Sequence, residues 1–284
     1  MKKTYRRSDA LNALILDKLV EVFQELNWDL HNDDRFNRFC NLLSRLKDEE
    51  QQLILKLTKS FFYCGLNHYP AAISQVVNKI TEALPQNIKE IIAVPLVSPR
   101  DVGKVKSGSL LIYLISPELK QVASSKGLKF SNIDRCSELA EKKARRNTFI
   151  LFVDDFLGSG TTAKEALDEY KQRYRAEDDH VLVATLVAQQ KAVNLLKNLG
   201  IESVFSYLRT RGISDSDSFP DKEFALTLID QIEDRLKVRP GFRRGYQQSE
   251  ALVCMIKCPN NTFPVFWIKN KIDGELWPAP FPGK

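Results

Sequence analysis

The sequence predicts an α/β fold in which a parallel sheet is flanked by helices, with a helical lobe before it and a C-terminal extension after it. Three observations support this prediction. Short continuous apolar runs alternate with helical patterns over residues 86–236, as in sheets whose strands are buried on both faces. Apolar residues recur every three or four positions over residues 1–85, which is typical of helices. Residues 237–284 are rich in aromatic side chains and prolines, and we expect them to pack on the α/β core.

The composition is that of an ordinary globular protein. The 284 residues are 43% hydrophobic and 27% charged, and 42 basic against 36 acidic side chains give a net charge of +6. These values exclude a disordered chain, and the modest positive charge suits an anionic small molecule or a weak nucleic-acid contact. No apolar run is long enough to cross a membrane. Five scattered cysteines and three histidines show no metal-ligand spacing, so we expect reduced thiols in a cytoplasm.

Four helices are expected in the N-terminal lobe. Apolar stripes cover residues 11–26 and 36–46. Asp48 should cap a third helix, because Asp48 and Gln51 have the spacing of a capping box. A fourth should carry Pro70 in its first turn. Nothing in these helices suggests chemistry, and we interpret them as a packing lobe or a partner surface.

The α/β core is predicted from buried strands and the helices between them. Ligands in such sheets bind at the carboxyl ends of the strands, so the informative residues should follow the apolar runs. The expected strands contain residues 91–94, 149–153, 181–187 and 203–205, and the expected helices cover residues 161–174 and 189–199.

The strongest signal is the segment that follows the second of these strands. Two adjacent acids, Asp154 and Asp155, end the strand, and a loop of small residues leads into a helix at Thr161. Small residues allow the backbone to approach an anion closely, and the free amides of a helix N-terminus favour a phosphate. Paired carboxylates accept hydrogen bonds from vicinal hydroxyls or help to hold a divalent cation. Together these features describe a cradle for a ribose 5-phosphate.

The same segment resembles the cofactor loop of S-adenosylmethionine-dependent DNA methyltransferases. Asp155, however, stands where those enzymes have proline. The next predicted strand runs into Gln189 rather than into an acid that could bind a cofactor ribose, and no Asp/Asn-Pro-Pro-Tyr tetrapeptide occurs. The methyltransferase therefore remains the less favoured alternative.

The whole of residues 150–162 resembles the signature of the type I phosphoribosyltransferases: an apolar run, two acids, two apolar residues and a Ser/Thr/Gly loop ending in threonine. Within that superfamily the chain is most similar to divergent phosphoribosyltransferase-like proteins of bacterial conflict systems, some of them retron antiphage systems. Three segments carry the closer resemblance, namely 153–160 (VDDFLGSG), 245–252 (GYQQSEAL) and 259–267 (PNNTFPVFW). The resemblance covers about residues 86–270 and implies a phosphoribosyltransferase-like sheet.

The resemblance implies a role for each part of the site. Asp154 and Asp155 would be the catalytic carboxylates, holding the 2′- and 3′-hydroxyls of phosphoribosyl pyrophosphate and reaching Mg²⁺ indirectly through those hydroxyls. A loop after the first predicted strand would hold the pyrophosphate. The 5′-phosphate would be bound by Gly158, Ser159, Gly160, Thr161 and Thr162, and the pyrophosphate by Ser98, Arg100, Lys104, Lys106 and Ser107.

One departure limits the implied activity. Gly158 stands where some purine-salvage relatives carry an acidic general base, so 6-oxopurine salvage by that route is not expected.

Two hypotheses about the function stay open. The protein is either a glycosyl-transfer enzyme acting as an antiphage effector, or a catalytically silent subunit that binds a nucleotide or nucleic acid. The resemblance implies as partners phosphoribosyl pyrophosphate or a nucleotide, a reverse transcriptase with its non-coding RNA or DNA, and a second copy of the chain.

Overall fold

The computed structural model describes residues 11–30, 34–101, 107–142 and 145–282, which form two compact units. The sheet unit spans residues 65–210. The helical unit combines the chain up to residue 64 with the chain from residue 211 onward. Each unit has its own buried apolar core.

In the described part of the sheet unit, five parallel strands lie in the order β3-β2-β4-β5-β6. This confirms the predicted α/β class, and each expected apolar run lies within a strand. The edge strand β3 has no continuous apolar run and was not expected. The strands are β2 (Glu90–Pro95), β3 (Lys129–Asn132), β4 (Thr148–Leu157), β5 (Asp179–Gln189) and β6 (Glu202–Arg209).

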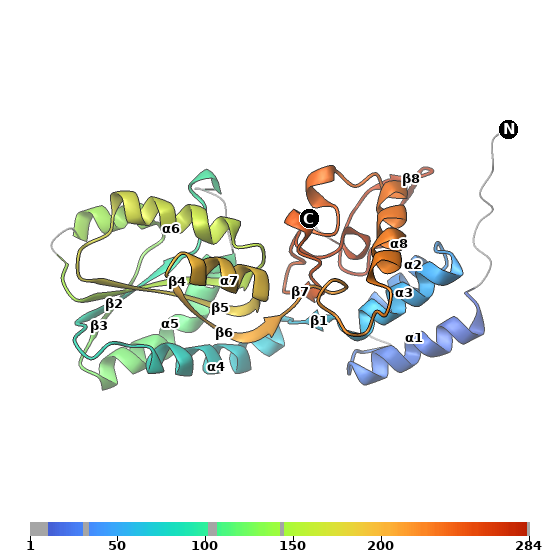
Figure 1. Ribbon diagram of the computed structural model, residues 1–284. Coiled ribbons are helices and arrows are strands. Elements are labelled where there is room, and N and C mark those ends of the chain that lie inside the picture. The colour runs from blue at the N-terminus through green and yellow to red at the C-terminus, as the bar shows by residue number, and fades with distance from the viewer. Residues whose placement is uncertain (1–10, 31–33, 102–106, 143–144, 283–284) are drawn as a thin grey trace. The chain divides into compact units, whose positions relative to one another are not determined.

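Helices cover both faces of this sheet (Figure 1). The helices α6 (Thr161–Arg173) and α7 (Gln190–Asn198) pack on one face, where Phe152 and Val183 belong to their core. The helices α4 (Tyr69–Glu82) and α5 (Ser107–Ser125) lie on the other face. Burial on both faces explains why the central strands consist of unbroken apolar runs. Short 3₁₀ helices in this unit are η1 (Leu66–His68), η2 (Pro99–Asp101) and η3 (Cys136–Lys142).

The helical unit is built from both ends of the chain. Aromatic rings from the two ends meet in its core, where Phe61 stacks on Phe281 with ring centroids 4.6 Å apart. Its helices are α1 (Ala13–Glu25), α2 (Arg35–Leu43), α3 (Asp48–Lys59) and α8 (Lys222–Arg235). Its short elements are β1 (Phe62–Tyr63), β7 (Val253–Cys254), β8 (Lys271–Ile272), β9 (Glu275–Leu276), η4 (Pro240–Phe242), η5 (Tyr246–Gln248) and η6 (Pro264–Phe266).

The unit boundaries differ from the predicted divisions 1–85, 86–236 and 237–284. Helix α4 belongs to the sheet unit, while α8 belongs to the helical unit. The C-terminal extension shares a core with α1, α2, α3 and α8 within the helical unit. An amphipathic stripe shows which face of a helix is buried but not which core receives it, so the sequence pattern could not assign α4 or α8.

The start of α3 also differs from the prediction. Asp48 is the first residue of the helix rather than its cap, because Lys47 occupies the N-cap position. The Glu50 carboxylate accepts the backbone N–H of Lys47 at 3.0 Å, and the Gln51 side chain donates instead to the carbonyl of Leu43 at 2.9 Å. The helix start is one residue earlier than the capping pattern indicated. Within the described ranges, no helix is both long enough and apolar enough to span a membrane.

Candidate functional site

The topology of the sheet predicts where a ligand binds. Strand β4 lies between β2 and β5. The chain leaves β2 into α5 on one face of the sheet and leaves β4 into α6 on the opposite face. Adjacent parallel strands whose following helices lie on opposite faces leave a crevice at their carboxyl ends. The two loops that border this crevice are the two in which the sequence placed the phosphate and pyrophosphate ligands.

The predicted carboxylate pair lies near the carboxyl end of β4 at this crevice, and the strand continues past the pair to Leu157 rather than ending at it. The Asp154 Oδ1 atom accepts a hydrogen bond from the Ser107 hydroxyl at 2.7 Å and another from the backbone N–H of Asp155 at 2.9 Å. The Asp155 Oδ2 atom accepts the hydroxyl of Tyr69 at 2.9 Å. A side chain at Gly108 would come within 2.8 Å of the Val153 carbonyl oxygen, so the absence of a Cβ there lets the start of α5 approach β4.

Among the described residues, no cation balances the charges of this pair. Burial and the neighbouring Asp155 charge raise the pKa of Asp154 well above its ordinary value, although the hydrogen bond from Ser107 opposes this shift. In the ranges that the structure covers, no lysine or arginine forms an ion pair with either acid. Hydroxyl donors on a ligand, or a cation bound with it, would relieve this repulsion.

The predicted phosphate loop joins β4 to α6. Gly160 adopts a φ of +83°, a left-handed conformation that favours glycine, and a Cβ there would come within 2.7 Å of the Leu195 side chain. The hydroxyls of Ser159 and Thr161 lie 3.0 Å apart, so both side chains face the same small space. The first-turn amides of α6 have no acceptors within the helix, which makes this helix start a site for an anion. All five predicted phosphate residues, from Gly158 to Thr162, therefore occupy this turn.

The predicted pyrophosphate residues have other partners in the structure. The Ser98 hydroxyl donates to the Glu165 carboxylate at 2.5 Å, and the Arg100 guanidinium lies 3.5 Å from the same carboxylate. The Ser107 hydroxyl, as described above, bonds Asp154. Lys104 and Lys106 lie outside the described residues. A shallow hollow of about 300 Å³ beside this loop is lined by Pro99, Arg100, Glu165, Asp168, Glu169, Gln172 and Arg173, and its three acids make it unsuited to an anion.

The contact of Tyr69 with Asp155 was not predicted from the sequence. Tyr69 was assigned to the packing lobe, yet it is only 1% exposed and its hydroxyl reaches Asp155, 86 positions away in the chain. The residue precedes Pro70 at the start of a helix, a context that indicates helix initiation rather than a functional contact. Only the packing of α4 against the sheet brings this hydroxyl to the end of β4.

The sequence matches a protein-family model over most of its length. The PRTase-CE family model matches residues 37–282, which include the carboxylate pair, the phosphate loop and both C-terminal motifs. The chain belongs to the PRTase-CE family. Since the match begins within α2 and continues to the end of the aromatic tail, the family includes most of the helical unit as well as the sheet unit.

Solved phosphoribosyltransferases resemble part of this PRTase-CE protein. The orotate phosphoribosyltransferase of Aeropyrum pernix is 15% identical, with a TM-score of 0.30 over 50% of this chain and 71% of that chain. The Helicobacter pylori xanthine-guanine-hypoxanthine phosphoribosyltransferase is 12% identical, with a TM-score of 0.31 over 52% and 89%. No curated protein matches the sequence significantly. Because both TM-scores lie below 0.5, the family assignment rests on the family model alone.

The two C-terminal motifs of the PRTase-CE protein pack against each other. Gly245 has a φ of +80°, and a Cβ there would come within 1.9 Å of the Asn261 carbonyl oxygen. The Asn261 side chain donates to the Ser249 hydroxyl at 2.8 Å. The buried Glu250 carboxylate accepts the backbone N–H of Ser214 at 2.8 Å. These polar residues therefore have structural partners within the helical unit.

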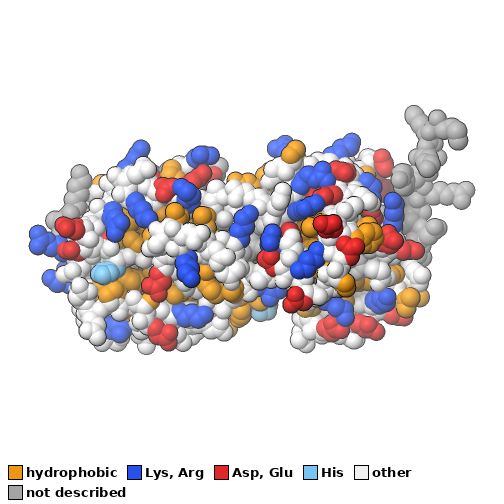
Figure 2. Space-filling view, viewed as in Figure 1, with side chains coloured by type: hydrophobic (Ala, Val, Ile, Leu, Met, Phe, Trp, Pro, Cys, Tyr) orange, Lys and Arg blue, Asp and Glu red, His pale blue; other side chains and the backbone are white. Residues whose placement is uncertain are grey.

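The basic residues near these motifs are paired with acids. Arg243 contacts Asp234 at 2.7 Å, Arg244 pairs with Asp230, and Arg235 contacts Glu50 at 2.7 Å. On the face drawn in Figure 2, Lys and Arg side chains are interspersed with Asp and Glu. The positive charges of Arg235, Arg243 and Arg244 are therefore neutralised by acids within the chain.

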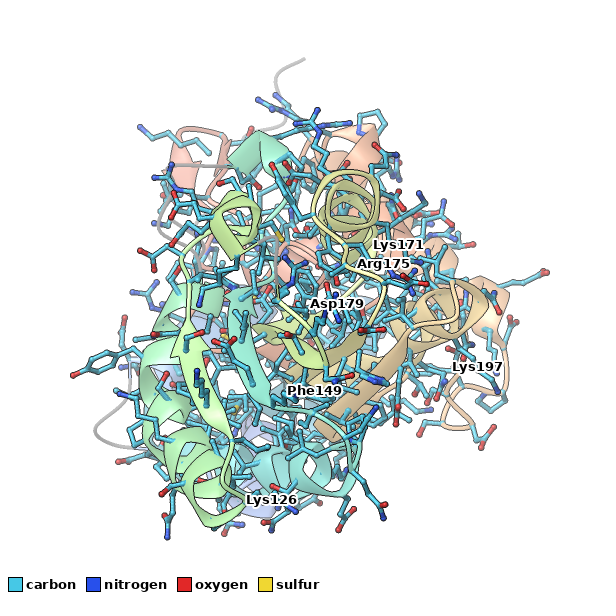
Figure 3. All side chains as sticks on the ribbon, turned by 90° about the vertical axis from the view of Figure 1, so that its left-hand side faces the viewer. Lys126, Phe149, Lys171, Arg175, Asp179 and Lys197 are labelled. Carbon is cyan, nitrogen blue, oxygen red and sulfur yellow. The ribbon has the colours of Figure 1, made fainter. Side chains whose placement is uncertain are left out.

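Arg145, which precedes β4 in the chain, forms a further structural ion pair. The Arg145 guanidinium donates to both carboxylate oxygens of the buried Asp179, at 3.1 and 2.7 Å. The hydroxyl of Tyr170 and the backbone N–H of Ala176 donate to the same carboxylate at 2.5 and 2.9 Å. Figure 3 shows this amino edge of the sheet, where Phe149 and Asp179 lie near the starts of β4 and β5. Arg145 therefore stabilises the edge opposite to the candidate site.

The carboxylate pair fits a magnesium ion that arrives with a phosphorylated ligand. Mg²⁺ binds oxygen, keeps several waters, and is commonly held by one or two carboxylates together with substrate phosphates. Among the described residues, hydroxyl donors reach one oxygen of each carboxylate, Asp154 Oδ1 and Asp155 Oδ2. No cluster of three or more metal-ligating side chains occurs among the described residues. The residues suit an indirect contact through ligand hydroxyls rather than a metal site made by the protein alone.

Proposed function

We propose that this PRTase-CE protein binds phosphoribosyl pyrophosphate or a nucleotide through a ribose 5-phosphate cradle, and that it acts as a phosphoribosyltransferase-like glycosyltransferase. The observation that carries the proposal is the carboxylate pair near the carboxyl end of β4, which lies beside the phosphate loop and has no cationic partner among the described residues. Burying like charges without compensation is unfavourable. A ligand that supplies hydroxyl donors and a cation would remove that cost.

The residues of the chain would bind and orient the donor. Asp154 and Asp155 would accept the ribose hydroxyls, while the amides at the start of α6 and the hydroxyls of Ser159 and Thr161 would bind the 5′-phosphate. Arg100 would contact the pyrophosphate after leaving Glu165. Bound Mg²⁺ would supply neutralisation of the pyrophosphate charge. The carboxylates of Asp154 and Asp155 would stabilise positive charge on the ribose ring electrostatically.

The biological setting belongs to the same proposal. The segments 245–252 and 259–267 support a role as effector of a bacterial antiphage system, with a reverse transcriptase and its non-coding RNA or DNA as partners, because they carry the resemblance to such proteins. All five cysteines are free thiols, which suits a reducing cytoplasm. The phosphoribosyltransferase family assignment favours this function over the methyltransferase alternative.

Calorimetric titration with phosphoribosyl pyrophosphate and Mg²⁺ tests the proposed site. The double variant Asp154→Asn/Asp155→Asn should bind at least about a hundredfold more weakly, because two charge-assisted contacts are lost. The matched control is Glu177→Gln/Asp178→Asn, which removes two adjacent exposed acids from the same unit. The proposal fails if the wild-type protein does not bind, or if both double variants bind as it does.

Turnover distinguishes the enzyme from the silent subunit. Pyrophosphate release is measured with the wild-type protein, Mg²⁺ and a panel of nucleobases and nucleotides. The enzyme hypothesis predicts release that the double variant loses. Binding without release supports the regulatory subunit, an alternative favoured by the engagement of Ser98 and Arg100 with Glu165.

A further inference from the structure

The hydroxyl of Tyr69 is the protein's own donor to the second carboxylate of the candidate site. Tyr69 lies in the first turn of α4, next to Pro70, and its side chain is almost entirely buried. Its hydroxyl donates to the Asp155 Oδ2 atom at 2.9 Å. Asp155 is itself only 7% exposed, so the contact lies inside the protein rather than at its surface.

We propose that Tyr69 is a positioning residue, which fixes Asp155 so that its Oδ1 atom is presented to a ribose hydroxyl. The inference rests on the proposed function and extends it to a residue outside the signature segment. Ser107 plays the matching part for the first acid, because it occupies the Asp154 Oδ1 atom at 2.7 Å. Among the described residues, each carboxylate is thus held at one oxygen by a hydroxyl at a helix start.

The chemistry of the donor matters as much as its position. A lysine or arginine in place of Tyr69 would hold Asp155 equally well but would neutralise its charge. A tyrosine hydroxyl is neutral, so it orients the carboxylate and leaves its negative charge available. A carboxylate that must accept ligand hydroxyls therefore gains orientation without losing its attraction for the ligand.

The rigidity of Tyr69 supports this role. The aromatic ring is fixed by burial in α4, whose apolar residues Ala72, Ile73 and Val76 are also buried. A binding group that is held by a packed neighbour loses less conformational freedom when the ligand binds. A flexible polar side chain at the surface would not hold Asp155 in one orientation before the ligand binds.

The test compares Tyr69→Phe with Tyr170→Phe. Both substitutions remove a buried hydroxyl that donates to an aspartate while keeping the ring, but Tyr170 serves Asp179 at the opposite edge of the sheet. Calorimetric titration with phosphoribosyl pyrophosphate and Mg²⁺ should show binding about tenfold weaker for Tyr69→Phe. Tyr170→Phe should bind as the wild type does. Thermal unfolding measured on both variants checks that each is folded.

Equal binding by Tyr69→Phe and the wild type overturns the proposal, and so does an equal loss in both variants, which would make the role of Tyr69 structural. A ligand-free measurement separates this inference from the proposed function. A tyrosine hydroxyl proton held in a buried hydrogen bond gives a slowly exchanging proton resonance. That resonance should be present in the wild type, absent from Tyr69→Phe and shifted in Asp155→Asn. If the wild type binds no phosphoribosyl pyrophosphate, the proposed function fails, and this resonance alone decides whether Tyr69 orients Asp155.

Discussion

Aspartates lie at both edges of the same sheet, with Asp155 and Asp179 buried and Asp154 half-buried, and the protein surrounds them differently. At the amino edge, Asp179 is matched by the bidentate Arg145 and by two further donors, including Tyr170. At the carboxyl edge, Asp154 and Asp155 receive only hydroxyl and backbone donors within the described residues. The first edge holds a neutralised ion pair, and the second holds two like charges side by side.

The difference teaches how a structural acid can be distinguished from one that serves a ligand. A buried acid that only stabilises the fold needs a cationic partner and satisfied oxygens, and Asp179 has both. A carboxylate pair that has no cation among the described residues is a cost to the unliganded protein, which the structure retains at a place where a ligand is expected. The amino edge therefore serves as an internal reference for the carboxyl edge.

The largest effect on stability is expected from removing the ion pair between Arg145 and Asp179 at the amino edge of the sheet. Asp179→Asn should lower the free energy of unfolding by about 3–5 kcal/mol, because it leaves the buried Arg145 guanidinium without its counterion. Urea denaturation measures the change. The exposed neighbour Asp178 provides the control, since Asp178→Asn should change the stability by less than about 0.5 kcal/mol. If Asp179→Asn changes the stability only slightly, the ion pair does not account for the difference between the two edges of the sheet.

A smaller effect on stability, of opposite sign, is expected from replacing Asp154 at the carboxyl edge of the sheet. The raised pKa of Asp154 means that the folded protein holds a proton that the unfolded chain releases, so stability falls as pH rises from the ordinary aspartate range through that raised value. Asp154→Asn removes this fall and should be more stable than the wild type by roughly 1–3 kcal/mol at neutral pH. Below the ordinary aspartate range the difference should disappear.

Denaturation of the ligand-free protein at a series of pH values measures this second effect. The control is Asp134→Asn, at an exposed aspartate of the same unit, which should follow the wild-type curve. If Asp154→Asn is less stable than the wild type at neutral pH, the carboxylate of Asp154 stabilises the fold. The proposed difference between the two edges of the sheet is then wrong.

The smallest effect on stability is expected at Arg100. Its side chain is 84% exposed and lies 3.5 Å from Glu165, so Arg100→Ala should change the free energy of unfolding by less than about 0.5 kcal/mol. It should nevertheless weaken binding of phosphoribosyl pyrophosphate several-fold if Arg100 contacts the pyrophosphate. The matched control is Arg173→Ala, on the other side of the same hollow. Equal binding by the two variants would remove Arg100 from the site.

The sequence predicted four of the five described strands of the sheet, and the position of the carboxylate pair, because those features are local. An apolar run such as 149–153 and the adjacent Asp154 and Asp155 are visible without knowing what lies beside them. The family assignment then supports the interpretation that the signature segment suggested.

The partners of the site could not be predicted because they depend on packing. The bond from Tyr69 to Asp155 joins residues 86 positions apart, and no pattern in α4 marks it. The neutralisation of Arg244 by Asp230 is hidden for the same reason, since a basic residue gives the same sequence signal whether it is paired or free. The roles of the pyrophosphate residues remain predictions.

The discontinuous helical unit has a consequence for synthesis of the protein. The helices α1, α2 and α3 leave the ribosome first, but the aromatic residues that complete their core, including Phe266 and Phe281, come more than 200 residues later. The 146 residues between the two halves form a unit with its own core, and closing a loop of that length costs only a few kcal/mol of chain entropy. Until the C-terminal segment arrives, the nascent N-terminal helices expose an unfinished apolar surface that chaperones recognise. Co-translational folding of the chain therefore proceeds from the middle outward.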